Sequence, residues 1–326
     1  MTGWNDKKEK RALRRYRFTF VFRVIRILAI IFFVYTLYVM VISIGYQYSK
    51  KGNKLNAYAQ LAIDWQYPGV SSEYINSSTE INPFLTQKTS VPIIRHIGKN
   101  EENIGELKVN KPLFMSLMNV QYEFEQKSFQ PNFDFWLPYH PETGITSDLE
   151  DDINVWDTLE KVHEGTVAEL AFSTSDFLTP EEILTLLSNF DLAVKWMPVY
   201  MGELQEFTEG SHGSNSVAVN SWGLTEGKEY DDRYRLTAST SLSGASVEEN
   251  KQVMIDNMKR IYKDDPKLAE KIFNTSYFDE RIQFIEENGF MVYGAVITGP
   301  SKELLKLKEL DEIGGVQLGE VQLWNW

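Results

Sequence analysis

The sequence predicts an α+β extracytoplasmic domain, with split βαβ units on a small sheet, carried on a single N-terminal transmembrane helix. Three observations lead to this fold class. An uncharged, largely apolar run, Ile27–Ser49, lies near the N-terminus of the 326-residue chain. The second half of the chain alternates strand-like apolar runs with helix-start signals. Two of its strand–helix–strand segments share a proline at the helix start, Pro180 and Pro300, and similar leucine spacing after it.

The apolar run has the length and flanks of a membrane anchor. As a helix, Ile27–Ser49 spans roughly 35 Å, enough for a hydrocarbon core of about 30 Å. Nine basic residues precede the run, and three follow it closely (Lys50, Lys51 and Lys54). This bias predicts a single-pass protein of the cell membrane, with a cytoplasmic N-terminus and an extracytoplasmic C-terminal domain. The alternative is a cleaved signal peptide, but its apolar region is usually only about 7–15 residues long.

Composition excludes several classes of protein. The chain carries 33 basic and 46 acidic residues, and residues 1–26 alone are +7. The remaining residues therefore total −20, which argues against direct binding of nucleic acid. Because there is no cysteine, disulfides, thiol nucleophiles and thiolate zinc sites are excluded.

Four segments make up the predicted organisation. They are a basic cytoplasmic tail (1–26), the transmembrane helix (27–49), a polar stalk with a small strand-containing subdomain and an aromatic connection (50–155), and a C-terminal α+β domain (156–326). In the third segment, Val91–Ile97 and Ile104–Val109 are expected to be strands. Pro112–Phe124 could be helix or strand, and Phe129–Pro141 is too rich in proline for a regular helix.

The last segment has the clearest pattern. Thr179, Pro180 and Glu182 predict a capped helix start between the strands Val167–Phe172 and Ala193–Tyr200. Pro198 within the second strand favours a sheet edge or a strand end. Further on, the sequence predicts a central strand, a helix after Gly299-Pro300 and a final strand, with the two strands at Met291–Thr298 and Val316–Trp324.

A glycine- and serine-rich excursion, Gly202–Ser243, separates the two strand–helix–strand units. After it, Ser246–Glu249 has the pattern of a capping box, and apolar residues from Val247 to Ile261 form one helical stripe. Ser276–Asn288 predicts another helix, which Gly289 ends.

Catalytic motifs are missing from the sequence. It has no phosphate-binding glycine loop, no HExxH pair and no G-x-S-x-G turn, and its four histidines are dispersed. An extracellular hydrolase is therefore disfavoured, since no nucleophile–base pair or carboxylate pair can be named. We expect no enzyme activity, no catalytic residue, no cofactor and no metal site.

Two groups of side chains are candidates for binding partners. In the basic tail, Trp4 lies far from the bilayer, and Leu13, Tyr16 and Phe20 can share one helix face. The alternative is that the tail only sets topology and contacts anionic lipid. The second candidate is an outer-surface aromatic cluster of Phe133, Phe135, Trp136 and Tyr139, for which ordinary core packing is the alternative.

The C-terminal domain resembles the sigma-factor-regulator family, the membrane-anchored anti-sigma factors of low-GC Gram-positive bacteria. The resemblance is carried by Tyr293–Leu310 (YGAVITGPSKELLKLKEL), Glu169–Thr185 (ELAFSTSDFLTPEEILT), Val194–Tyr200 and Val316–Trp324. It implies a negative regulator that senses envelope stress and sequesters an extracytoplasmic-function sigma factor to regulate transcription. The tail has only about 26 residues and no His or Cys. The sigma factor is therefore expected to bind either directly or through a second membrane anti-sigma subunit. The alternative function is a cell-envelope binding module with no transcriptional role.

Overall fold

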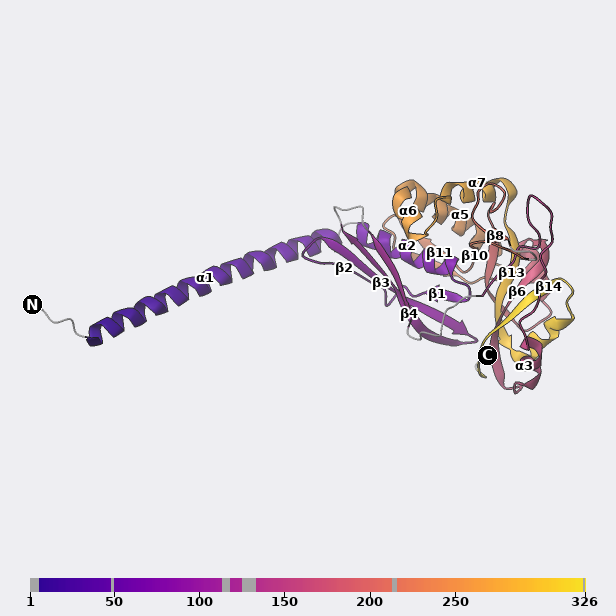
Figure 1. Cartoon of the computed structure of the whole chain (residues 1–326), viewed down its shortest axis with the longest axis horizontal. Helices are drawn as coiled ribbons and strands as arrows, with labels where there is room; N and C mark the ends of the chain where they lie inside the picture. Colours follow the sequence, from indigo (N-terminus) through magenta and orange to yellow (C-terminus); the bar gives the residue numbers. More distant parts are fainter. Residues whose placement is uncertain (1–5, 48–49, 113–117, 125–132, 213–215, 325) are drawn as a thin grey trace, which may run out of the picture.

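A long helix projects from a folded unit in the computed structural model (Figure 1). We call the described residues from 50 onward the outer unit, after the side of the membrane on which they are expected. The structure describes residues 6–47, 50–112, 118–124, 133–212, 216–324 and 326. Helix α1, Asp6–Gln47, has 42 residues and is therefore about 63 Å long. Its large apolar side chains are exposed along its length. Among the described residues, α1 is the one helix long and apolar enough to cross a membrane.

The N-terminal part of the outer unit combines one helix with an antiparallel sheet. Helix α2, Lys51–Gln66, is buried at every residue from Leu55 to Trp65 except Asn56, and it packs on strands β1 and β3. The strand order is β1-β3-β4-β5, and β2 also pairs with β3. The bounds are β1 Val70–Ser72, β2 Ser78–Ile81, β3 Thr86–Ile97, β4 Asn100–Pro112 and β5 Asn119–Phe124.

Both strands expected in this part are confirmed, in β3 and β4. Of the undecided segment Pro112–Phe124, the last six residues are a strand, while residues 113–117 lie outside the described residues. The structure differs from the expectation at the start of the polar stalk. Residues 51–66 form a helix buried in the outer unit, because polar side chains such as Asp64 find buried partners there. The boundary near residue 155 stays an interpretation.

The C-terminal sheet has the split βαβ topology. Its antiparallel order is β10-β7-β13-β6-β14. The strands are β6 Thr166–Leu178, β7 Ala193–Tyr200, β10 Trp222–Leu224, β13 Met291–Pro300 and β14 Ile313–Leu323. The units β6–α4–β7 and β13–α8–β14 interleave, with α4 at Pro180–Leu187 and α8 at Ser301–Leu305 followed by a 3-10 turn, η1, at Lys306–Glu309. This is the ferredoxin-like arrangement, and the predicted fold class and central strand are confirmed.

Local signals had mixed outcomes. The capping box at Thr179 is present, since Thr179 Oγ1 accepts from the Glu182 amide at 3.3 Å and Glu182 Oε2 accepts from the Thr179 amide at 2.7 Å. The box expected at Ser246 is wrong, because the hydroxyl of Ser246 instead donates to the Ser241 carbonyl.

Pro198 is not on an edge strand, but it lies where the pairing of β7 with β13 shifts register. A bulge there tolerates a residue without an N–H.

The remaining helices and short strands complete the outer unit. Helices α5, α6 and α7 lie together on one side (Figure 1). The stripe on α5 and the Gly289 stop of α7 are as expected. The bounds are α3 Val155–Lys161, β8 Ser211–His212, β9 Val217–Ala218, β11 Gly227–Tyr230, β12 Leu236–Thr240, α5 Val247–Asp264, α6 Pro266–Ile272 and α7 Phe278–Asn288.

Candidate functional site

Charged side chains join the two sheets. Arg95 on β3 reaches Glu169 on β6, with Nη2 2.7 Å and Nε 3.0 Å from the same carboxylate oxygen. The third guanidinium nitrogen is 3.1 Å from Glu320 on β14. Arg95 and Glu169 are buried. The approach is tight, because a Cβ at Gly69 would lie 2.3 Å from Glu169 Oε1, and the φ of +74° at Gly69 suits glycine.

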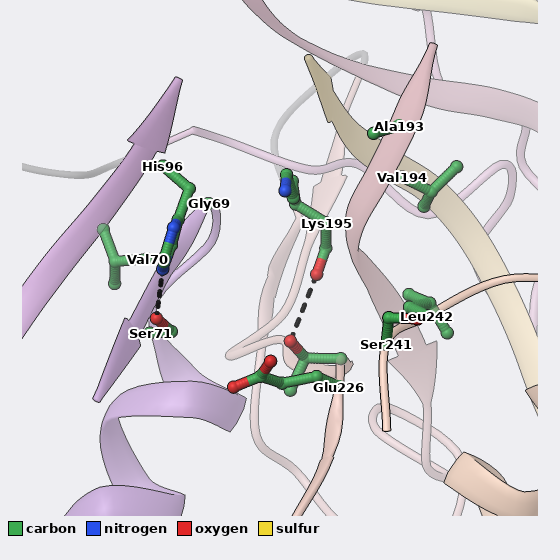
Figure 2. A pocket seen from close by; sticks show the side chains of 11 residues that line it. Gly69, Val70, Ser71, His96, Ala193, Val194, Lys195, Glu226, Ser241 and Leu242 are labelled. Carbon is green, nitrogen blue, oxygen red and sulfur yellow. Dashed lines mark hydrogen bonds between the residues drawn. The ribbon is translucent and has the colours of Figure 1, made fainter. Parts of the chain in front are cut away.

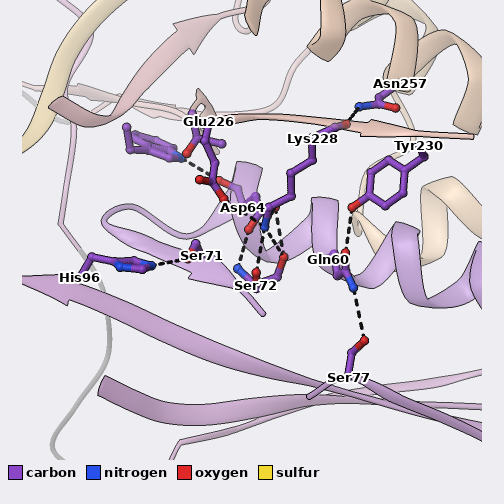
Figure 3. Close-up of polar contacts among 12 residues, drawn as sticks. Gln60, Asp64, Ser71, Ser72, Ser77, His96, Glu226, Lys228, Tyr230 and Asn257 are labelled. Carbon is purple, nitrogen blue, oxygen red and sulfur yellow. Dashed lines mark hydrogen bonds and ion pairs between the residues drawn. The ribbon is translucent and has the colours of Figure 1, made fainter. Parts of the chain in front are cut away.

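A second buried ion pair lies nearby (Figure 3). Lys228 on β11 places Nζ 2.8 Å from Asp64 on α2, and it also donates to the carbonyl and hydroxyl of Ser72. The Ser72 amide donates to Asp64 at 2.6 Å. Burial lowers the pKa of Lys228, but the carboxylates of Asp64 and Glu226 outweigh it, so the pKa is raised. Lys228 is therefore a permanent cation at physiological pH. We call Arg95, Glu169, Asp64 and Lys228 the ionic junction.

A cavity of about 310 Å³ lies beside the ionic junction, since its lining residues Gly69 and Glu226 approach Glu169 and Lys228. Figure 2 shows the residues that line it. Its walls come from both sheets and from the segments next to them. The lining residues are Gly69, Val70, Ser71 and His96 on one side and Ala193, Val194, Lys195, Thr225, Glu226, Ser241 and Leu242 on the other. A molecule in this cavity would therefore touch both halves of the outer unit at once.

Burial shifts the titration of three groups in and beside the cavity. It lowers the pKa of His96, and the nearby Lys195 lowers it further. It also lowers the pKa of Lys195, against the attraction of three glutamates. For Glu169, burial raises the pKa from 4.5 to about 7, against the effect of Arg95. At neutral pH, His96 is thus mostly uncharged, and Glu169 is close to half-protonated.

The cavity does not have a complete set of catalytic groups. Ser71 Oγ lies 2.7 Å from His96 Nε2, a distance found between a nucleophile and its base. The third group, Glu101, is 3.7 Å from His96 Nδ1, and its side chain is 72% exposed. That separation is longer than a hydrogen bond, so Glu101 does not fix the imidazole. Among the described residues there is also no group of three His, Asp or Glu side chains that could hold a metal ion.

The candidate residues of the tail lie on the long helix. Leu13, Tyr16 and Phe20 are exposed on α1, which extends the helix of the membrane segment through most of the tail. Trp4 lies outside the described residues. Binding of a partner by these residues stays a prediction.

The aromatic cluster lies partly in the core. Phe135 is 4% exposed, and its ring centroid lies 5.3 Å from that of Trp196. Tyr139 packs edge-on against Phe177. Phe133, Trp136 and Tyr139 are each half-buried, so they keep some surface for contacts with another molecule. Such contacts stay a prediction for these three residues.

Sequence reasoning missed the ionic junction and the cavity. A faint signal was present, because Glu169 interrupts the apolar run VAELAF and Arg95 interrupts VPIIRHI. A charged residue inside a buried strand needs a partner. The sequence does not say which partner, because the paired residues are far apart in the chain. Arg95 and Glu169 are separated by 74 positions, and Asp64 and Lys228 by 164.

Comparisons with known proteins match two separate regions of the chain. Residues 10–102 match the family model described as sigma factor regulator N-terminal, and residues 159–320 match the one described as sigma factor regulator C-terminal. The chain is similar to a Bacillus subtilis (strain 168) protein named "Probable anti-sigma-M factor YhdL". The two are 21% identical over 286 residues, covering 84% of this chain and 71% of the relative. No solved structure matches. Each ion pair of the ionic junction joins one matched region to the other.

Proposed function

Because this chain belongs to the sigma-factor-regulator family, we propose that it is a membrane-anchored negative regulator of an extracytoplasmic-function sigma factor. It acts by sequestering its partner and not by catalysis, because the family to which it belongs is a regulatory one. The relative's name describes a protein that opposes a sigma factor, which supports this proposal.

The observation that carries the proposal is the continuity of α1. One helix holds the basic tail and the apolar run, and it ends a few residues before the buried helix α2. Its length of about 63 Å is roughly twice the hydrocarbon thickness of a bilayer. About twenty residues therefore extend beyond the bilayer, and their positive charge supports a cytoplasmic location.

We call this part of α1, roughly residues 6–26, the cytoplasmic stem. It is the segment that can bind a sigma factor or another regulator. It has room for one binding face, and Leu13, Tyr16 and Phe20 form an apolar face of the kind that docks in a groove. The basic side chains on the rest of the stem contact anionic lipid. A helix this short cannot enclose a two-domain protein. The sigma factor is therefore bound either directly by this face or through a second membrane anti-sigma subunit.

The outer unit is the sensing part. A signal that enters the cavity or disturbs the ionic junction changes how the two sheets meet. Since Asp64 lies on α2, which follows α1 in the chain, such a change reaches the anchor through a short connection.

Topology can be tested with single cysteines, because the chain has none of its own. In intact cells, a membrane-impermeant thiol reagent should label Lys161→Cys, which is exposed on the outer unit. It should label Lys10→Cys only after permeabilisation. Labelling of Lys10→Cys in intact cells would contradict the proposed orientation.

Partner capture tests the function. The full-length chain and a chain lacking residues 1–24 are purified from solubilised membranes of the native host. A sigma factor recovered only with the full-length chain supports direct binding, and Leu13→Glu/Tyr16→Glu should then lose it while Arg11→Gln/Arg15→Gln keeps it. Equal recovery with both chains indicates the second subunit. If neither chain recovers a sigma factor or an anti-sigma subunit, the envelope-binding alternative replaces the proposal.

A further inference from the structure

A turn of the outer unit lies against the membrane helix. The hydroxyl of Tyr38 on α1 donates to the carbonyl of Pro83 at 3.2 Å, and β2 contacts α1 (Figure 1). Tyr38 belongs to the apolar run that starts after Arg26. It lies about 18 Å along the helix from Arg26, against a hydrocarbon thickness of about 30 Å. The turn between β2 and β3 is therefore level with the outer half of the bilayer.

This turn is built to lie away from water. It reads Ile81-Asn82-Pro83-Phe84-Leu85 and has no charge. Asn82 accepts hydrogen bonds from the backbone amides of the turn. Its side-chain Oδ1 accepts from the amides of Phe84 and Thr86, and its backbone carbonyl accepts from the amide of Leu85. The amide of Asn82 donates to the Thr86 carbonyl, and Pro83 has no N–H. Backbone donors that are satisfied internally are what a water-poor region requires.

The side chain at the tip of the turn is apolar and uncovered. Phe84 is 88% exposed, although aromatic residues are usually at least partly buried. The nearest charges on the hairpin are Glu80 and Lys88, which face each other across β2 and β3. Glu80 is four residues before Phe84, or about 13 Å along a strand. Phe84 can therefore enter the acyl region while this charged pair stays among the headgroups.

We propose that the β2–β3 turn enters the outer leaflet of the bilayer that α1 crosses, with Phe84 at its tip. This inference rests on the membrane placement of α1 under the proposed function. Lipid fits better than a protein partner as the occupant. If the bilayer surrounds Tyr38, it also surrounds the turn that contacts Tyr38. The outer unit then has two membrane contacts, and a tilt of its N-terminal sheet moves the turn against α1.

The test uses the full-length chain with one cysteine introduced at a time. Phe84→Cys carries an environment-sensitive fluorophore, and the protein is reconstituted in vesicles of phosphatidylcholine and phosphatidylglycerol. A fraction of the lipid bears a nitroxide quencher near the headgroup end of the acyl chain. Two matched positions are Ile153→Cys, 92% exposed just before α3 at the far end of the outer unit, and Leu37→Cys on α1 (Figure 1).

We expect quenching at Phe84→Cys to be several-fold stronger than at Ile153→Cys and comparable with that at Leu37→Cys. If Leu37→Cys is quenched while Phe84→Cys behaves like Ile153→Cys, the turn is in water and the inference is overturned, although α1 still crosses the bilayer. If Leu37→Cys is not quenched either, the membrane placement itself fails, and the proposed function fails with it.

Discussion

The two sheets of the outer unit are buried to different degrees. In the C-terminal sheet, β13 is buried at nine of its ten residues, and the first nine residues of β6 are buried as well. In the N-terminal sheet, β5 alternates between exposed and half-buried residues, and β3 is only partly buried. A sheet that is covered on both faces gives continuous apolar strands, whereas a sheet with one wet face alternates.

The contact between the N-terminal and C-terminal parts combines apolar packing with charges. Apolar side chains of both parts, such as Trp65 and Trp222, belong to one buried cluster. Beside it, in the ionic junction, buried carboxylates meet Arg95 and Lys228. Apolar packing does not respond to pH, but buried charges do. We infer that the apolar cluster supplies stability that does not depend on pH, while the ionic junction makes the contact between the two parts sensitive to pH. The following substitutions test that division.

The largest effect is expected in the apolar core. Phe172→Ala removes a fully buried ring from β6 and should lower the free energy of unfolding by about 3–5 kcal/mol. Urea unfolding of the solubilised full-length chain measures this loss, which should be the same at pH 6 and pH 8. A loss that changes strongly with pH would contradict the assignment of pH sensitivity to the junction.

Breaking the Asp64–Lys228 pair should cost a similar amount. Lys228→Met leaves the Asp64 carboxylate buried without its cation, a change that costs about 3–5 kcal/mol. In the double variant Asp64→Asn/Lys228→Met, the amide oxygen still accepts from the Ser72 amide, so at least half of the loss should return. A surface control, Lys161→Met, should stay within about 0.5 kcal/mol of the wild type. If Lys228→Met behaved like this control, the pair between α2 and β11 would not stabilise the folded chain.

A smaller, pH-dependent effect is expected at Glu169. Because its pKa rises from 4.5 to about 7 on folding, the folded state binds the extra proton between these pH values. Stability from this group is full below about pH 4.5 and is lost as the pH rises through 7, by about 3 kcal/mol in total. His96, with a lowered pKa, opposes this trend below its ordinary 6.5.

Glu169→Gln isolates the contribution of Glu169, because His96 is present in both proteins. The two chains should be about equally stable near pH 5, and the wild type should become the less stable one by pH 7.5. Unfolding curves at both pH values provide the measurement. Parallel pH profiles would show that Glu169 does not titrate in this range.

The smallest effect is expected at the start of α4. Thr179→Ala removes the side-chain cap from the Glu182 amide and should cost about 1 kcal/mol. Because the cap lies at the surface of the C-terminal half, the effect should not depend on pH between 6 and 8. The midpoint of thermal unfolding should fall by a few degrees, and an unchanged midpoint would contradict the role of the cap.

Local signals in the sequence were sufficient for four of the five strands of the C-terminal sheet, but β10 lies in the segment expected to be a glycine- and serine-rich excursion and was missed. The run at Met291–Thr298 predicted a central strand because full burial shows in every residue, and the box at Thr179 depends on neighbours only. The same motif failed at Ser246, where the Ser241 carbonyl competes for the hydroxyl. Helix α2 was missed because buried polar residues such as Gln60 and Asp64 interrupt the apolar pattern that would mark a buried helix.

The ionic junction and the membrane-facing turn could not be predicted from local pattern. Asp64 and Lys228 belong to different halves of the chain, and neither residue has a neighbour that names its partner. Tyr38 and Pro83 are 45 residues apart, so their contact exists only once α1 and the N-terminal sheet are placed together. The sequence showed the anchor and the fold class, and the folded chain was needed to show where they touch.

The central claim is that this chain restrains a sigma factor. The most direct measurement is transcription from the promoters of the captured sigma factor, in cells that lack this chain and in cells that regain it. The account predicts that loss of the chain raises transcription and that the full-length chain restores the low level. A chain lacking residues 1–24 should fail to restore it if the proposed stem binds the sigma factor directly, and should restore it if a second membrane subunit does. Unchanged or lower transcription after loss of the chain would contradict the account.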